Sequence, residues 1–198
     1  MAKLLIRKRK QLKEKNLKNL SKRILLILTG SIASAKSGDL IKELRGRGWL
    51  VTCVLTRAAE HFVTPLAVRA FSGQPVYGEF FSPETPYDVL HTALAEESDL
   101  ILAAPASADF IARLAAGMAD DLASCIILAA RKPIVVAPAM NDVMYQHPLT
   151  QRNLEVLRSS GYHVIDPIEG DLVCGKTAIG HIPEPRALGD AVQKILGA

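Results

Sequence analysis

The sequence predicts an α/β fold in which a parallel sheet is covered by helices on both faces. The first reason is the alternation of short apolar runs with helical patterns, which is typical of right-handed βαβ units. The second is that the apolar runs show no polar alternation, as expected for strands buried on both faces. The third is composition: the 198 residues are 49% hydrophobic and only 5% aromatic, which suits one domain with a substantial core.

The expected elements follow from these patterns in chain order. Apolar runs predict strands at 24–28, 50–55, 100–104, 133–137 and 162–165, with a short candidate near 75–77. Apolar residues at helical spacing predict helices at 34–46, 59–72, 91–97, 109–131, 149–160 and 187–196. We expect Gly117 to break the long helix over 109–131, since glycine disfavours helix interiors.

The charges are divided between a basic N-terminal segment and an acidic remainder. Residues 1–23 hold ten Lys and Arg against Glu14, whereas the remainder carries 14 basic and 19 acidic residues. We therefore expect residues 1–21 to form a mobile basic arm and residues 22–198 to form the domain. The arm suits RNA, anionic lipid or an import receptor, or no partner at all. The acidic domain itself argues against nucleic acid as a partner.

Several observations predict a cytoplasmic or organellar protein that does not span a membrane. No apolar run approaches the ~20 residues of a membrane-spanning helix. The N-terminus lacks the long apolar region and small-residue cleavage site of a secretory signal. The three cysteines, Cys53, Cys125 and Cys174, are odd in number and widely spaced, which indicates reduced thiols.

The loop after the first strand has the composition of a phosphate-binding turn. Thr29-Gly30-Ser31-Ile32 leads from that strand into a helix, whose N-terminal N–H groups favour an anion. A dinucleotide site would show three spaced glycines here and an acidic residue after the second strand, but that strand ends in Thr56-Arg57. The sequence therefore argues against NAD and for a mononucleotide with one phosphate, with Lys36 and hydroxyl groups as further donors. The alternative is that Gly30 only makes a plain turn.

Two later strands also end in polar residues, where open α/β sheets bind their ligands. Ser107 follows one of them and suits either a helix cap or the same phosphate. Asn141 follows the strand at 133–137, and its amide suits a carboxylate or a helix cap. Between them, the small residues of 115–122 leave room for a planar ring, although Gly117 and Asp120 also read as a helix end and the next cap.

Two further residues are candidates for proton transfer. His91 opens a short helix, where the positive end of the helix dipole favours a neutral imidazole that accepts a proton. Cys174 lies between glycines in a loop, a setting that core packing does not explain. No histidine has metal-ligand spacing to another His or to a Cys, so we expect no metal.

Taken together, these motifs resemble the homo-oligomeric flavin-containing cysteine decarboxylases over residues 22–185. The order and spacing of the segments are more specific than any single one. The segments that carry the resemblance are Thr29–Ala33, His91, Pro105–Asp109, Gly117–Leu122, Pro138–Asn141 with Met144, and Val173–Gly175.

The resemblance implies a Rossmann-like flavoprotein that binds FMN and decarboxylates 4'-phosphopantothenoylcysteine in coenzyme A biosynthesis. It also implies self-association as a trimer, or as trimers grouped into a dodecamer. His91 would be the base, Asn141 would hold the substrate together with Met144, and Cys174 would be the acid in a flap over the site. The FMN-binding residues would be Gly30, Ser31, Ile32, Thr56, Ser107, Met118, Asp120 and Met140.

The chain departs from the family pattern in this flap. Relatives continue as Cys-Gly-Asp and Gly-Arg-Met, whereas this chain has Lys176 and then Gly180-His181-Ile182. Tyr145 also stands where many relatives have tryptophan. These departures leave substrate preference open. The alternatives are a peptidyl-cysteine decarboxylase and a non-catalytic flavoprotein regulator on the same scaffold; a flavin prenyltransferase would not need both His91 and Cys174.

Overall fold

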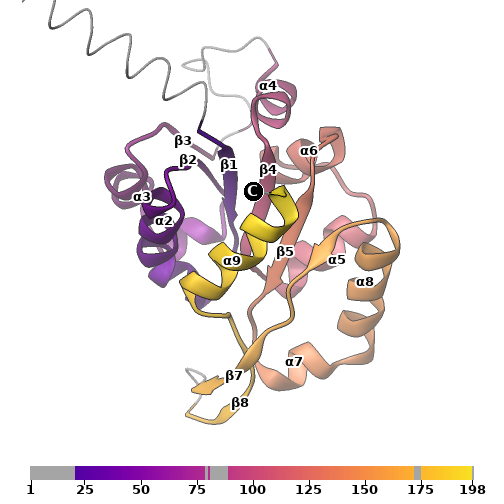
Figure 1. Cartoon of the computed structure of the whole chain (residues 1–198). Coiled ribbons are helices and arrows are strands. Elements are labelled where there is room, and N and C mark those ends of the chain that lie inside the picture. Colours follow the sequence, from indigo (N-terminus) through magenta and orange to yellow (C-terminus); the bar gives the residue numbers. More distant parts are fainter. Residues whose placement is uncertain (1–20, 79, 81–88, 172–174, 198) are drawn as a thin grey trace, which may run out of the picture.

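The protein folds around a six-stranded parallel sheet with the order β3-β2-β1-β4-β5-β6 (Figure 1). The computed structural model describes residues 21–78, 80, 89–171 and 175–197. Residues 1–20 of the expected arm and Cys174 lie outside the described residues. The strands are β1 (Arg23–Leu28), β2 (Leu50–Leu55), β3 (Val76–Tyr77), β4 (Leu100–Ala106), β5 (Ile134–Pro138) and β6 (His163–Val164).

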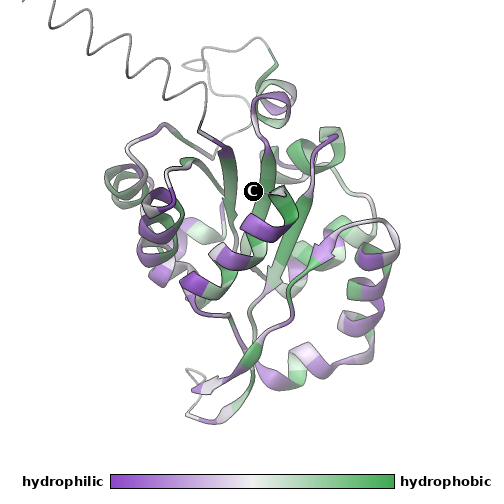
Figure 2. Cartoon of the chain, viewed as in Figure 1, coloured by the Kyte–Doolittle hydropathy of each residue, from purple (hydrophilic) through white to green (hydrophobic). Residues whose placement is uncertain are grey.

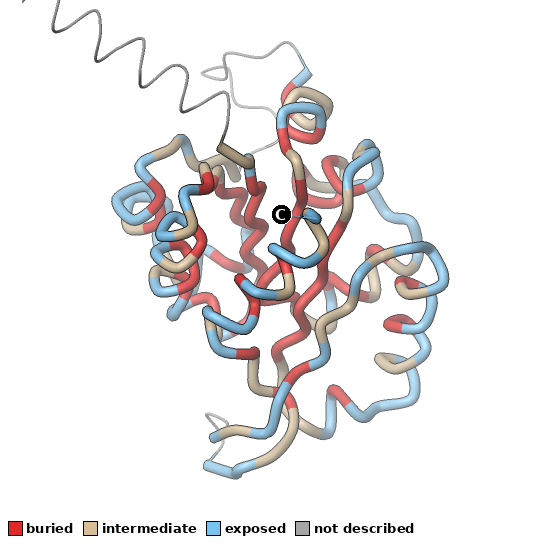
Figure 3. Tube along the Cα trace, viewed as in Figure 1, coloured by how far each residue is buried: buried red, intermediate tan, exposed pale blue. Residues whose placement is uncertain are grey.

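Each predicted strand is present, with ends that move by at most two residues. The apolar runs were legible because β1, β4 and β5 lie in the middle of the sheet and are buried on both faces. Figure 2 shows these strands as the most hydrophobic part of the described chain, and Figure 3 shows them as its buried centre. The expected parallel sheet is therefore confirmed.

Helices cover both faces of the sheet and complete three layers. On one face α2, α3 and α9 bury Leu40, Val68 and Val192 against the sheet. On the other face α4, α5, α6 and α8 bury residues such as Phe110 and Leu154. The helix bounds are α2 (Ser37–Gly46), α3 (Pro65–Ser72), α4 (Leu90–Glu97), α5 (Ala108–Ala115), α6 (Leu122–Ala129), α7 (Asp142–Gln146), α8 (Pro148–Ser159) and α9 (Pro185–Leu196).

Two helix predictions need correction. The single helix expected over 59–72 is wrong: a 3₁₀ turn, η2 (Ala59–His61), precedes α3. The break follows from local chemistry, because the Thr64 hydroxyl caps α3 and Pro65 takes its first position. Likewise, the helix expected over 34–46 begins as a second 3₁₀ turn, η1 (Ile32–Lys36), before α2.

The break expected at Gly117 is confirmed, but the cap after it lies one residue later than expected. Gly117 has a φ of +68°, which favours glycine, and it follows the end of α5. Asp121, not Asp120, is the N-cap of α6, where its carboxylate accepts the Ser124 N–H at 2.8 Å. The Asp120 side chain therefore does not cap the helix and pairs with another group.

An antiparallel hairpin, β7 (Ile168–Asp171) with β8 (Thr177–His181), stands apart from the main sheet. The sequence reading placed a flap here but predicted no strands. Figure 1 shows the hairpin next to α7, at the carboxyl end of the sheet. The residues between its strands that carry the expected acid, 172–174, lie outside the described part.

The strand order places a topological switch point between β1 and β4. The chain runs from β1 outward to β2 and β3, and then crosses back to place β4 on the other side of β1. Consecutive loops leave these two strands in opposite directions, and the crevice between them is where open α/β sheets bind ligands.

None of the described helices is long and apolar enough to cross a membrane.

Candidate functional site

A buried threonine joins the two loops at the switch point. The Thr29 hydroxyl donates to the Pro105 carbonyl at 2.7 Å and accepts the Ser107 N–H at 2.8 Å. Thr29 is 1% exposed, so both bonds are shielded from water. Its own carbonyl accepts the hydroxyl of Ser34 at 2.7 Å. The sequence reading quoted Thr29 only as part of a motif and missed this role.

A cavity of about 420 Å³, here called the Thr56 cavity, opens beside these loops. Its lining includes Gly30, Thr56, Arg57, His61, Ser107 and Arg113. The volume falls in the range of small-molecule sites. Three of the expected cofactor residues, Gly30, Thr56 and Ser107, thus meet in one cavity.

The two hydroxyls in the Thr56 cavity retain their own protons for a ligand. Thr56 Oγ1 accepts the Ala59 N–H at 3.3 Å, and Ser107 Oγ accepts the Phe110 N–H at 3.3 Å. A hydroxyl that accepts through its lone pairs can still donate its O–H. Together with the guanidinium of Arg57 and a ring N–H of His61, these donors suit one phosphate group.

Gly30 is required at its position because the loops approach too closely for a side chain. A Cβ atom on Gly30 would lie 2.6 Å from the Cβ of Ala58. Real Cβ atoms essentially never approach so closely. The cavity wall is therefore backbone at this point, as expected where a chain must come close to a ligand.

A second cavity of about 320 Å³, here called the Asn141 cavity, lies on the other side of the β1 loop. Its lining includes Ser31, Ile32, Lys36, Met140, Asn141 and His181. The Ser31 hydroxyl donates to the Ala139 carbonyl at 3.0 Å and so connects the β1 loop with the β5 loop. Ser31 is 8% exposed, which makes it a structural link more than an open phosphate donor.

Asn141 is both a helix cap and a wall of this cavity. It is the N-cap of α7, where its side-chain oxygen accepts the Val143 N–H at 3.0 Å. The two readings of this residue are therefore compatible, because a carboxamide has an acceptor oxygen for the cap and a separate donor nitrogen. Met144, one turn into α7, is 49% exposed and does not line the cavity.

The β7–β8 hairpin is fixed to the β5 loop beside Asn141. The Met140 N–H donates to the Gly180 carbonyl at 3.1 Å. Gly180 has a φ of +134°, and a Cβ there would lie 2.2 Å from the Met140 carbonyl oxygen. This contact leaves no room for any other residue, so the root of the flap is held at the mouth of the Asn141 cavity.

The expected ring-binding segment is organised by an ion-pair cluster. Arg113 pairs with Asp120 and, at 3.1 Å, with Asp121. The hydrogen bond from Arg113 holds the pKa of the Asp120 carboxyl below its ordinary value. Arg113 and Asp121 line the Thr56 cavity, but Asp120 and the 45%-exposed Met118 do not.

His91 lies far from these cavities in its own chain. It is the second residue of α4 and stacks on Phe80, with ring centroids 5.5 Å apart. Arg23, at the start of β1, pairs with Glu97 at the end of α4. Figure 1 shows α4 at the opposite end of the molecule from α7 and the hairpin. One chain therefore does not bring His91 together with Asn141.

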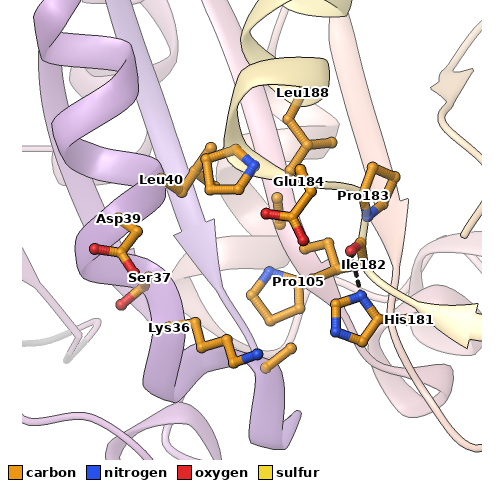
Figure 4. Close-up of a pocket in the computed structure, with 13 residues that line it drawn as sticks. Lys36, Ser37, Asp39, Leu40, Pro105, His181, Ile182, Pro183, Glu184 and Leu188 are labelled. Carbon is orange, nitrogen blue, oxygen red and sulfur yellow. Dashed lines mark hydrogen bonds between the residues drawn. The ribbon is translucent and has the colours of Figure 1, made fainter. Parts of the chain in front are cut away.

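Lys36 does not line the Thr56 cavity, where Thr56 and Ser107 lie. It lines the Asn141 cavity and a third cavity of about 280 Å³, here called the Glu184 cavity, which includes Ser37, His181 and Glu184. Figure 4 shows the Lys36 side chain extending toward His181. Among the described residues, no cluster of three His, Cys, Asp or Glu side chains is placed to hold a metal ion.

The departure at Tyr145 preserves a buried aromatic residue. Tyr145 is 9% exposed, belongs to the core below α7, and donates its hydroxyl to Asp166 at 3.0 Å. Burial and the hydrogen bond to this carboxylate raise the pKa of the phenol. The side chain thus anchors the short helix that Asn141 caps.

Comparison with known proteins places this chain in one family. The flavoprotein family matches residues 12–197, and the chain belongs to it. The chain is 44% identical over 167 residues to coenzyme A biosynthesis bifunctional protein CoaBC of Vibrio cholerae, covering 84% of this chain and 42% of that protein. It is 43% identical over 169 residues to the Escherichia coli protein of the same name, covering 85% and 42%. The chain thus spans about two fifths of the length of these relatives.

Solved structures of similar proteins agree with this family assignment. A PPC decarboxylase mutant complexed with pantothenoylaminoethenethiol superposes with a TM-score of 0.78 at 31% identity, covering 90% of this chain and all of that one. The FMN-dependent cysteine decarboxylase SpaF superposes with a TM-score of 0.77 at 29% identity, covering 88% of this chain and 95% of that one. The Rossmann-like, three-layer fold expected from the resemblance is therefore confirmed.

Proposed function

We propose that this protein is an FMN-dependent decarboxylase that converts 4'-phosphopantothenoylcysteine to 4'-phosphopantetheine in coenzyme A biosynthesis. The observation that carries the proposal is the placement of Asn141 on a cavity wall at the switch point, next to a second cavity with donors for one phosphate. The likeness to PPC decarboxylase and to the CoaBC proteins supports the reaction and the substrate. The charged, phosphorylated substrate also supports a cytoplasmic location.

The Thr56 cavity fits the phosphate of FMN. Thr56 and Ser107 offer hydroxyl donors, Arg57 offers positive charge, His61 offers a ring N–H, and Gly30 lets the backbone approach. Ile32 and Met140, which line the neighbouring cavity, and the Arg113 cluster would hold the ring. When bound, FMN supplies a hydride acceptor for the substrate and later a hydride donor, so the reaction has no net oxidation.

The residues of the chain would bind the substrate and move its protons. Asn141 would hold the substrate carboxylate through its amide donors and align the bond to CO₂ with the C=S group of the oxidised cysteine. His91 would remove the proton of the substrate thiol. Cys174 would return a proton to carbon once CO₂ has left, which gives the saturated aminoethanethiol.

This division of labour requires more than one subunit. His91 is the second residue of α4, and α4 lies at the other end of the sheet from α7, which Asn141 caps. We therefore propose a homo-oligomer, a trimer or trimers grouped into a dodecamer, in which His91 reaches a flavin held largely by a neighbour. A fully active monomer in light scattering would contradict this arrangement.

The proposed function is tested by two measurements on the purified protein. We expect it to be yellow, to release FMN and not FAD on denaturation, and to release CO₂ from 4'-phosphopantothenoylcysteine. A peptide that ends in cysteine serves as the comparison substrate. A protein that takes up no FMN, or that decarboxylates only the peptide, would refute the proposal.

A further inference from the structure

The Asn141 and Glu184 cavities are neighbours that share part of their lining. Both are bordered by Ala33, Lys36, His181 and Ile182. One cavity extends from this shared border to Asn141 at the end of β5, and the other extends to the start of α9. A long, narrow ligand whose reacting end lies at Asn141 would therefore pass the Lys36 and His181 side chains.

Lys36 is a cation without a partner of its own. In the described part of the chain no carboxylate lies within ion-pair distance of its ammonium group, whereas Lys42, on the same helix as Asp39, pairs with that aspartate at 3.3 Å. The Lys36 side chain extends toward His181 in Figure 4. An ammonium group placed in this way is a point charge with three donors, which suits a phosphate.

The His181 ring is held in a defined orientation by the backbone carbonyl of the next residue. Its Nδ1 lies 2.7 Å from the Ile182 carbonyl oxygen, and a carbonyl oxygen can only accept (Figure 4). Nδ1 therefore carries a proton, and Nε2 is the ring nitrogen that remains for a ligand.

Ser37 and two carboxylates, Asp39 and Glu184, also border the Glu184 cavity and limit what it can bind. Ser37 is only 3% exposed, and its buried hydroxyl oxygen has no hydrogen-bond partner within the described residues. Such an oxygen marks a place where a polar ligand atom would be accommodated. Glu184 is the N-cap residue of α9, but its side chain makes no capping hydrogen bond. It faces the cavity from the opposite side. An anionic group would thus lie on the Lys36 side, away from this carboxylate.

We propose that Lys36 and His181 bind the phosphate monoester of the substrate while its cysteine end lies at Asn141. This assignment rests on the proposed function. It assigns the two phosphates to different places: the cofactor phosphate belongs to the Thr56 cavity, and the substrate phosphate belongs to the border of the Asn141 and Glu184 cavities. Lys36, first expected to serve the cofactor, serves the substrate.

The test measures binding of non-reacting ligands to the flavin-loaded protein by titration calorimetry. The ligands are 4'-phosphopantetheine, pantetheine and inorganic phosphate. We expect the wild type to bind the phosphorylated ligand at least tenfold more tightly than pantetheine, since charge-assisted hydrogen bonds to phosphate are about twice as strong as neutral ones. Lys36→Met should lose most of this preference, His181→Gln should lose part of it, and Lys36→Arg should keep it. None of these changes should alter pantetheine binding or the FMN content.

Lys132→Met is the matched control, because Lys132 is exposed and precedes β5 at the amino end of the sheet. Equal affinities of the wild type for the two pantetheines would overturn the inference. So would an equal loss for both ligands in Lys36→Met, loss of FMN from that variant, or inorganic phosphate that binds as tightly as the phosphorylated ligand. Because no turnover is measured, a failure of the decarboxylase proposal would appear separately, in the CO₂ assay.

Discussion

Replacement of Gly180 by alanine tests whether the root of the flap must lie against the β5 loop. The added Cβ would meet the Met140 carbonyl oxygen at 2.2 Å, and the φ of +134° is essentially confined to glycine. Backbone strain of this kind costs about 1–3 kcal/mol. The shift that relieves the contact also breaks the Met140 N–H bond to the Gly180 carbonyl, which contributes about 1 kcal/mol. We expect a total of about 2–4 kcal/mol.

The assay compares this variant with Gly48→Ala. Gly48 has a φ of +82°, but a Cβ there meets nothing within 4 Å, so only the conformational cost of about 1–2 kcal/mol applies. Urea unfolding gives the stability of each variant, and amide exchange at Met140 reports whether the hairpin has left the β5 loop. A Gly180→Ala variant no less stable than Gly48→Ala, with an equally protected Met140 amide, would show that the contact does not hold the flap.

Further predictions concern the proposed chemistry and the core. His91→Asn should retain FMN but lose about 10²–10⁴ in rate, the usual range for a positioned proton-transfer group. Near-normal turnover would show that another residue is the base. Cys174→Ser should still release CO₂ but accumulate a product two hydrogens lighter in mass spectra, since a serine hydroxyl is a far weaker acid than a thiol; normal product at the normal rate would exclude Cys174 as the acid. Removal of residues 1–21, which precede β1, should leave FMN content and rate within about a factor of two. Burial raises the pKa of the Cys53 thiol to about 12, so the folded state should lose stability as pH rises from about 9 towards 12, where the unfolded thiol ionises first; Cys53→Ala should flatten this part of the urea-measured pH profile.

The sheet could be predicted from the sequence because its strands are buried on both faces. A run such as that at 134–138 has no solvent-facing residues to interrupt it, and its length excludes most helices. The hairpin of β7 and β8 was not predicted because its strands are short, only Gly180 among their residues is buried, and they show no apolar alternation. The helix expected over 59–72 was wrong because the cap at Thr64 and the proline after it were outweighed by the apolar pattern around them.

The site was predictable as a set of residues but not as a geometry. Ser107 and Asn141 were identified because polar residues after buried strands must gather at one edge of a parallel sheet. The sequence could not show that Lys36 faces a different cavity from Gly30, because the direction of its side chain depends on the 3₁₀ turn that precedes α2. The role of Thr29 depends on a contact 76 residues away, for which the local sequence carries no signal.

The bonds of the β1 loop make the two sides of the site thermodynamically dependent on each other. Gly30 borders the Thr56 cavity, while the next residue, Ser31, is bonded to Ala139 just before Asn141. Thr29 and Ser31 fix this loop to two neighbours at once. A ligand that favours one position of the loop therefore changes the free energy with which the other cavity binds its own ligand. Any factor by which bound flavin improves the affinity for substrate is therefore the same factor by which substrate improves the retention of flavin.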